Sequence, residues 1–319
     1  MDSLLARFAE NGFWIARYLE RIENLARILD VNETFARDGD GAQEWLPVVQ
    51  LYSDEEGFFE TNNEATADAV LYFYILDRNN PGSITSLLRN ARENAREIRH
   101  LISTEMWLQI NTFYNRISSL SPRQFTLTRL SGLCSTIKLD CQLHTGIVEG
   151  TLYRDQLWQF YQLGQAIERA DMGTRLLDIK YHRLLPSVAE VGSAIDVAEW
   201  NALLRSVAGY HAYRRQHPTA MELQNIAGFL LFDRKFPRSI AACVDEVQEH
   251  LDALRAFEGL RHTEMPMKSI AALFGICRTY DILTVIDEGM HEFLERLQIL
   301  LIEFSKELGQ TFFGHQNDQ

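Results

Sequence analysis

The chain has 319 residues, of which 46% are hydrophobic and 24% are charged, and these proportions exclude a disordered, collagen-like or low-complexity protein. The formal net charge of −13 argues against nucleic acid as a partner, because such binding needs a basic face. No uncharged apolar run approaches about 18 residues, so neither a transmembrane helix nor a membrane partner is expected. The 4 cysteines show no CxxC spacing and the N-terminus carries no basic leader, so we expect reduced thiols and a cytoplasmic protein.

Helical spacing of apolar residues recurs along almost the whole chain. Residues Ile15–Leu29 step by four and three, which predicts one helix face. Asn80-Pro81 opens a second helix, and Ser121-Pro122 starts another that runs toward Gly146. The same apolar steps recur over Leu163–Leu177, and a long amphipathic run extends from Thr279 to Leu308. No alternating strand pattern is visible, so we predict an all-α fold of about ten helices packed as bundles, without a sheet.

Two motifs recur in the same order along the chain. The pair Glu20-Arg21 returns as Glu168-Arg169, and the segment D-R-x-x-P-x-S-I at 77–84 returns at 233–240. This order predicts an internal duplication with two pseudo-symmetric halves, residues 1–150 and 151–313, packed as one globular unit and followed by a frayed tail over 314–319.

The second motif predicts the start of a helix in each half. Proline is expected at or near the first helical position, with serine in the first turn. The preceding Asp-Arg pair is expected to cap the helix or to form an ion pair across the turn. The residues concerned are Asp77, Arg78, Pro81, Asp233, Arg234 and Pro237.

A polar stripe lies beside the apolar face of each helix that carries an E-R pair. Each stripe combines three acids with one arginine and a small residue, and Arg21 and Arg169 lie away from it. The stripes are Glu20, Glu23, Arg27 and Asp30 in the first copy, and Glu168, Asp171, Arg175 and Asp178 in the second. Pairs four residues apart favour a structural ion-pair network, whereas the excess of acids keeps a ligand or metal site open as an alternative. We expect Glu20 and Glu168 to be buried and bonded to arginine, with Arg21, Arg27, Arg169 and Arg175 as candidates.

A stripe of arginines appears only in the first half. Arg89, Arg92, Arg96 and Arg99 repeat at helical spacing, with His100 beside them. These arginines either pair with acidic helix faces, remain solvated, or form a surface that binds a carboxylate or phosphate. We expect their helix to face the first E-R helix, so that some of them meet Glu20, Glu23 or Asp30.

Recognisable catalytic and metal motifs are scarce. Glu97-x-x-His100 and Glu288-x-x-His291 have the spacing of di-iron bundles, which would also need Glu20 and Glu168. The two elements do not fit the repeat, so a di-iron bundle is a remote alternative and no metal site is predicted. No G-x-S-x-G, P-loop, G-x-G-x-x-G or H-E-x-x-H motif occurs.

Several of these segments resemble one known family. F-W-I-A-R-Y-L-E-R-I-E-N-L-A-R-I-L-D at 13–30, Q-L-G-Q-A-I-E-R-A-D-M-G-T-R-L-L-D at 162–178, A-R-E-N-A-R-E-I-R at 91–99 and the D-R-x-x-P-x-S-I starts are similar to the bacterial alpha-E domain family. The resemblance covers nearly the whole chain. It implies an all-helical protein associated with ATP-grasp ligases and transglutaminase-like proteins, and thus with peptide synthesis or modification. It implies neither a particular reaction nor a cofactor.

Two functions follow from these observations. The first is an accessory or scaffold protein that works beside an ATP-grasp-type ligase and grips a peptide-like or anionic ligand. The alternative is an enzyme whose polar site lies where the two E-R helices meet. In that enzyme Glu20 or Glu168 would act as acid or base, and arginines would hold a carboxylate or phosphate.

Overall fold

The computed structural model describes residues 4–38, 45–121, 127–184, 194–218, 221–257, 260 and 268–315. Within these ranges the chain forms fifteen α-helices and no strand, which confirms the predicted all-α fold but exceeds the predicted number of helices. The helices belong to two compact units, a larger one of residues 1–17 and 153–319 and a smaller one of residues 18–152. The division at Leu152 lies close to the predicted boundary, but the first 17 residues belong with the C-terminal part.

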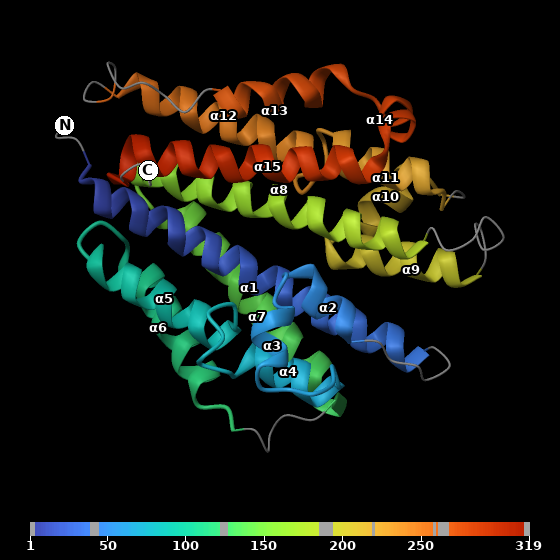
Figure 1. The fold of residues 1–319 in the computed structure, drawn as a ribbon. Coiled ribbons are helices and arrows are strands. Elements are labelled where there is room, and N and C mark those ends of the chain that lie inside the picture. The colour runs from blue at the N-terminus through green and yellow to red at the C-terminus, as the bar shows by residue number, and fades with distance from the viewer. Residues whose placement is uncertain are drawn as a thin grey trace. The chain divides into compact units, whose positions relative to one another are not determined.

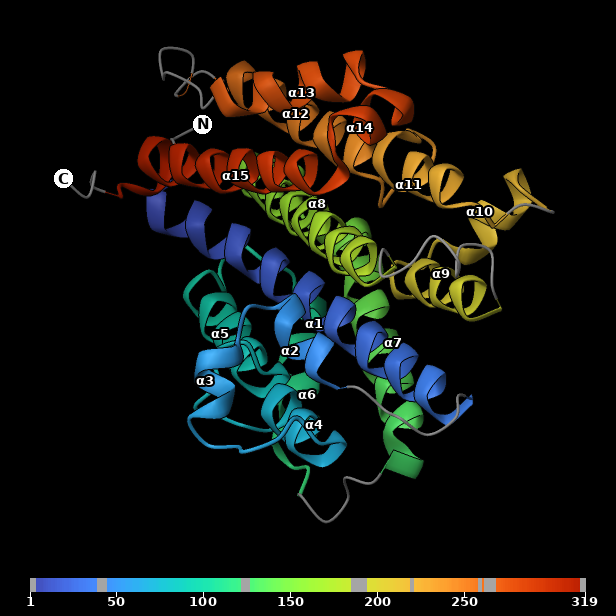
Figure 2. The same ribbon diagram turned by 45° about the vertical axis from the view of Figure 1, so that its right-hand side comes forward.

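The smaller unit is built on helix α1, which begins in the larger unit. Its helices are α1 (Ala6–Asp38), α2 (Leu46–Leu51), α3 (Glu55–Phe59), α4 (Ala67–Ile75), α5 (Ile84–Glu97), α6 (Thr104–Ser118) and α7 (Leu127–Thr151). Helix α6 packs against both α5 and α7, as Figures 1 and 2 show. Leu25, Phe113 and Ile137 are fully buried and belong to the core of this unit.

The larger unit is organised around helix α8. Its remaining helices are α8 (Gln156–Leu184), α9 (Ala194–Ser206), α10 (Tyr210–Gln216), α11 (Leu223–Phe232), α12 (Ile240–Ala256), α13 (Lys268–Thr279), α14 (Ile282–Glu288) and α15 (Met290–Leu308), followed by a π-helical turn (Gly309–Phe313). Helices α12 and α15 pack along α8, and α13 packs on both of them (Figure 1). No single described helix combines the length and apolarity needed to cross a membrane.

Within the larger unit, helix α8 and the first turns of α1 meet backbone to backbone. A Cβ atom at Gly164 would lie only 2.3 Å from the carbonyl oxygen of Phe13. Only glycine permits this approach, because any other side chain would overlap the neighbouring backbone. The contact also fixes which side chains of the two helices face each other one turn further along.

The D-R-x-x-P-x-S-I segments start helices in both places, although not in the predicted way. Ser83 and Ser239 are N-caps, and each side chain accepts a hydrogen bond from the backbone N–H three residues later, at 3.2 and 3.1 Å. Pro81 and Pro237 therefore lie in the turn before the helix, so their placement at or near the first helical position was wrong. Serine satisfies an otherwise unpaired backbone donor, and it occupies the cap for this reason.

The aspartates of these segments also play the same local role in both copies. Asp77 accepts a hydrogen bond from the backbone N–H of Asn79 at 2.9 Å, and Asp233 accepts one from that of Lys235 at 2.8 Å. Of the two following arginines, Arg234 forms an ion pair with Asp245. This local equivalence is what a duplication requires, and the superposition of the two halves stays a prediction.

The long helix predicted from Thr279 to Leu308 is interrupted. It divides into α14 and α15 at Gly289, whose φ of 107° is a conformation that favours glycine. Asp281 caps α14 by accepting a hydrogen bond from the backbone N–H of Thr284 at 2.8 Å. Two other predictions fall partly outside the described residues, namely Pro122 as the start of α7 and the frayed tail beyond His315. His315 itself is hydrogen-bonded to Glu10 at 2.9 Å.

Candidate functional site

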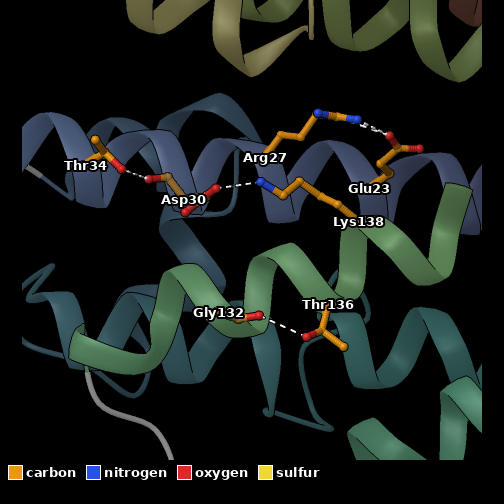
Figure 3. A network of polar contacts seen from close by, with 7 residues as sticks. All are labelled: Glu23, Arg27, Asp30, Thr34, Gly132, Thr136 and Lys138. Carbon is orange, nitrogen blue, oxygen red and sulfur yellow. Dashed lines mark hydrogen bonds and ion pairs between the residues drawn. The ribbon is translucent and has the colours of Figure 1, made fainter.

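Two acids of the first E-R helix are buried, and two of its acids form ion pairs with a nearby cation. Glu20 is 2% exposed and Glu23 is 6% exposed. Glu23 forms an ion pair with Arg27 at 2.5 Å, and Asp30 forms one with Lys138 of helix α7 at 2.6 Å (Figure 3). The predicted burial of Glu20 is confirmed, whereas its bond to an arginine stays a prediction. The pair between Asp30 and Lys138 was not foreseen.

Helix α7 carries two buried cysteines near these acids. Burial, reinforced by the nearby carboxylate of Asp30, raises the pKa of Cys134 to about 12. Burial and then the carboxylates of Glu23 and Glu20 raise the pKa of Cys141 well above its usual value. Both thiols are therefore protonated at neutral pH, and neither is prepared to act as a nucleophile.

The same helix carries a buried histidine. Burial lowers the pKa of His144 to about 3, so its imidazole is neutral at physiological pH. One ring nitrogen, Nδ1, is hydrogen-bonded to the side-chain oxygen of Gln109 at 2.8 Å. A neutral, buried histidine of this kind serves packing and hydrogen bonding, and it lacks access to solvent for proton transfer.

The second E-R helix has a buried ion pair of its own. Glu168 is fully buried, and Arg17 of helix α1 donates a hydrogen bond from Nε to its carboxylate at 2.9 Å. The guanidinium of Arg17 also lies over the rings of Trp14, at 4.9 Å, and Phe13, at 5.6 Å. The predicted burial and arginine partner of Glu168 are thus confirmed, but Arg17 was not among the expected partners.

The remaining members of the second stripe also have partners. Asp171 pairs with Arg175 at 3.0 Å, one helical turn away. Asp178 accepts a hydrogen bond from His291 of helix α15 at 2.8 Å, and this bond raises the pKa of the histidine. The i,i+4 pairing expected within each stripe is therefore confirmed for Glu23–Arg27 and Asp171–Arg175.

The two candidate acid/base residues belong to different compact units. Glu20 lies in the smaller unit and Glu168 in the larger one, and each has neighbours within its own unit. Arg21 and Arg169 are half-buried. An active site at the meeting of the two E-R helices stays a prediction.

The arginine stripe of helix α5 and the turn after it packs on aromatic residues of helix α6. Arg92 donates a hydrogen bond from Nε to Oδ1 of Asn111 at 2.7 Å. Its guanidinium lies 5.2 Å from the ring of Tyr114 and 5.8 Å from that of Trp107, and the guanidinium of Arg99 lies 5.7 Å from Trp107. We call Arg92, Arg99, Trp107 and Tyr114 the arginine–aromatic ladder. Each arginine can meet an aromatic ring because the two arginines are seven positions apart in the sequence and the two aromatic residues are also seven positions apart.

The remaining basic residues of this stripe are more exposed. Arg96 is 59% exposed in its side chain and pairs with Glu93 at 2.5 Å, and Arg89 and His100 are also exposed. The expectation that the stripe meets the acids of α1 was wrong, because among the described residues its partners lie on α5 and α6. The seven-residue spacing of the aromatic residues on α6 was the sequence signal that could have predicted these partners.

The Glu-x-x-His segments gain no support as metal ligands. Glu97 and His100 are exposed at the end of α5, and Glu288 accepts hydrogen bonds from Tyr280 at 3.2 Å and Arg296 at 3.1 Å. Across the described part of the chain, no three His, Cys, Asp or Glu side chains gather closely enough to hold a metal ion.

These observations define an all-helical protein with two E-R motifs whose glutamates are buried. The chain belongs to the Alpha-E family, described as a predicted alpha-helical domain with a conserved ER motif, whose profile matches residues 4–313. The chain is 24% identical over 278 residues to the uncharacterized protein Mb2597 of Mycobacterium bovis and to the uncharacterized protein MT2643 of Mycobacterium tuberculosis. Each match covers 81% of this chain and 31% of the relative, so the chain spans about a third of the length of these proteins. No solved structure matches the chain.

Proposed function

We propose that this protein is a helical accessory or scaffold protein that works beside an ATP-grasp-type ligase, or a transglutaminase-like protein, in peptide synthesis or modification. The observation that carries the proposal is the burial and ion pairing of the acids on the two E-R helices. Glu168 is fully buried against Arg17, and Glu23 and Asp30 are paired with Arg27 and Lys138. A general acid or base must reach its substrate, whereas Glu168 and Asp30 each join two helices and Glu23 is paired within its own helix.

The length of the relatives supports the same proposal. The mycobacterial proteins that this chain matches are about three times as long as the matched region, so a similar helical region there accompanies further chain. A helical module that occurs beside other parts of a protein fits a supporting role. The resemblance to the family indicates ATP-grasp ligases as the partners to test first.

The arginine–aromatic ladder is the surface on which such a protein would grip an anionic or peptide-like ligand. Tyr114 and Trp107 hold the guanidinium groups of Arg92 and Arg99 in place, and Arg92 retains 29% side-chain exposure. Guanidinium groups held in this way bind carboxylate or phosphate with little loss of side-chain entropy. The ladder contributes two arginines in a chain of net charge −13, and one of them, Arg92, also pairs with Glu93 at 3.0 Å.

Co-purification from the native cell tests the accessory function. A tagged chain is expected to capture an ATP-grasp-type ligase that mass spectrometry identifies. The ladder is tested separately with inorganic phosphate and a short glutamate-rich peptide, by calorimetry. An Arg92→Ala, Arg99→Ala variant is expected to bind the peptide about tenfold more weakly, which corresponds to about 1.4 kcal/mol. An Arg129→Ala, Arg215→Ala variant, which also removes two exposed arginines, is the matched control.

The same experiments address the alternative of an enzyme with a Glu/Arg site. Turnover of a peptide substrate by the purified chain alone, abolished by Glu20→Gln or Glu168→Gln in a folded protein, would replace the accessory function. Equal peptide affinities of the wild type, the Arg92→Ala, Arg99→Ala variant and the control would remove the ladder from the proposal.

A further inference from the structure

Helix α15 presents two large aliphatic side chains to solvent. Ile299 is 48% exposed and Ile302 is 56% exposed, although most of the helix is packed against α8 and α13 (Figure 1). Glu295 and Lys306 are exposed as well, and the four residues follow one another at steps of four, three and four. They therefore lie on one narrow face of the helix, opposite its buried side.

The spacing of this face is the same in both directions along the helix. Reversing the direction leaves the two isoleucines in equivalent positions and exchanges the acidic end with the basic end. The midpoint of the segment lies between Leu300 and Leu301. Glu295 and Lys306 are equally far from that point, and so are Ile299 and Ile302. A second copy of the helix that runs antiparallel thus brings each glutamate opposite a lysine and the isoleucines together at the centre. A parallel copy would instead oppose like charges.

The edge of the face repeats this complementarity. Arg296, which is 42% exposed, and Glu303 lie on the same side of the stripe. In the antiparallel arrangement they come to similar heights along the two helices, so that the arginine of one copy approaches the glutamate of the other. Arg296 already bonds Glu288 of its own chain at 3.1 Å, and its remaining donors suit a second carboxylate.

We infer that the exposed face of α15, formed by Glu295, Ile299, Ile302 and Lys306, is the surface through which two copies of this chain associate, antiparallel about a two-fold axis. The inference is independent of the proposed accessory function. A two-fold interface must be complementary to itself, and this face satisfies that condition in both apolar and charged positions. A membrane-binding face would carry an excess of basic residues, whereas this one has equal numbers of acids and bases.

The size of the face sets the expected affinity. The contact from residue 295 to residue 306 covers about three helical turns. Such a contact is smaller than a standard protein interface, so we expect a weak, reversible dimer whose population rises with concentration. The charged pairs lie at its rim, so added salt should weaken it.

Sedimentation velocity over a concentration series tests the inference with charge-reversed variants. Glu295→Lys and Lys306→Glu each place like charges opposite one another twice in a homodimer, and each is expected to weaken association at least about tenfold. A mixture of the two variants restores both attractive pairs, because the two lysines of one chain face the two glutamates of the other. The mixture is therefore expected to form a heterodimer of wild-type affinity.

Glu249→Lys is the matched control, because it makes the same charge change at an exposed position of α12. Far-UV circular dichroism confirms that each variant is folded. Orientation is checked by mixing Glu295→Cys with Lys306→Cys, which should form a disulfide mainly in the mixture, since the four native cysteines are buried.

Three results would overturn the inference. One is a wild-type chain that stays monomeric at the highest concentration reached. Another is an equal dimer affinity for the Glu295→Lys variant and the Glu249→Lys control. The third is a weakened dimer that the mixture fails to restore, since that result would refute the antiparallel register.

Discussion

Replacing Arg17 with methionine tests whether the buried E-R acids hold the fold together. The side chain of Glu168 is 1% exposed and that of Arg17 is 12% exposed, and their contact measures 2.9 Å. Methionine keeps much of the apolar packing of the arginine stem but removes the guanidinium, so it leaves a buried carboxylate without this cation. Breaking a buried pair from one side costs about 3–5 kcal/mol.

The measurement is a thermal or urea melt of the larger unit, with tryptophan fluorescence as a probe. A loss of 3–5 kcal/mol in a unit of this size corresponds to a fall in Tm of roughly 6–20 °C. Arg175→Met is the control on the same unit, because the pair with Asp171 is more exposed, with 28% and 13% side-chain exposure. Its expected cost is about 0.3–0.5 kcal/mol.

A third variant separates loss of the pair from loss of packing. When Arg17 and Glu168 are both replaced by methionine, much of the stability should return, because no uncompensated charge remains in the interior. Equal Tm shifts for Arg17→Met and Arg175→Met would refute the structural role assigned to the pair. A double variant that is less stable than the sum of its single variants would refute the reasoning about charge.

Further outcomes are expected elsewhere in the fold. Gly164→Ala should destabilise the protein by about 1–3 kcal/mol through overlap with the backbone of helix α1, whereas Gly146→Ala, at an exposed position of α7 with open space around it, should stabilise it by about 0.5–1 kcal/mol. Urea melts compare the two variants. The pKa of His291 is raised above its ordinary 6.5 by Asp178, so their bond stabilises the fold below that value and its contribution is lost as the pH rises through the raised pKa. Asp178→Asn should therefore lower stability near pH 5.5 but not near pH 9, and a pH-independent effect would contradict this assignment. The four buried cysteines should react with a thiol reagent in denaturant but only slowly in the native protein, and fast native labelling would contradict their burial.

The fold class and several helix starts could be predicted because they depend on local sequence. Apolar steps of three and four place Ile15 and Leu29 on one buried face, and both are fully buried. The break at Gly289 was missed because the amphipathic pattern continues across it, and a single glycine in such a run is often tolerated. Its positive φ depends on how α14 and α15 pack, which spacing alone does not determine.

The partners of the site residues were harder to predict for a similar reason. Helical spacing correctly paired Glu23 with Arg27, since both lie on one helix. The partner of Glu168 is 151 positions away, and it follows from the close approach of two helices at Gly164. Gly164 was visible in the sequence as a small residue beside the polar stripe. Its contact with the backbone of Phe13 depends on which helices pack together, and spacing along one helix does not determine that.

The division of helix α1 between two units affects the order in which the chain can fold during synthesis. The smaller unit is one continuous stretch and is complete once Leu152 has been made. The first turns of α1 must wait for the remainder, since the ring of Phe13 packs against Phe313 at 5.4 Å, near the far end of the chain. At ribosomal rates of about 5–20 residues per second, that interval lasts on the order of 10–30 s. For that time a nascent chain carries one finished unit and an uncovered apolar helix end, the kind of surface that chaperones bind.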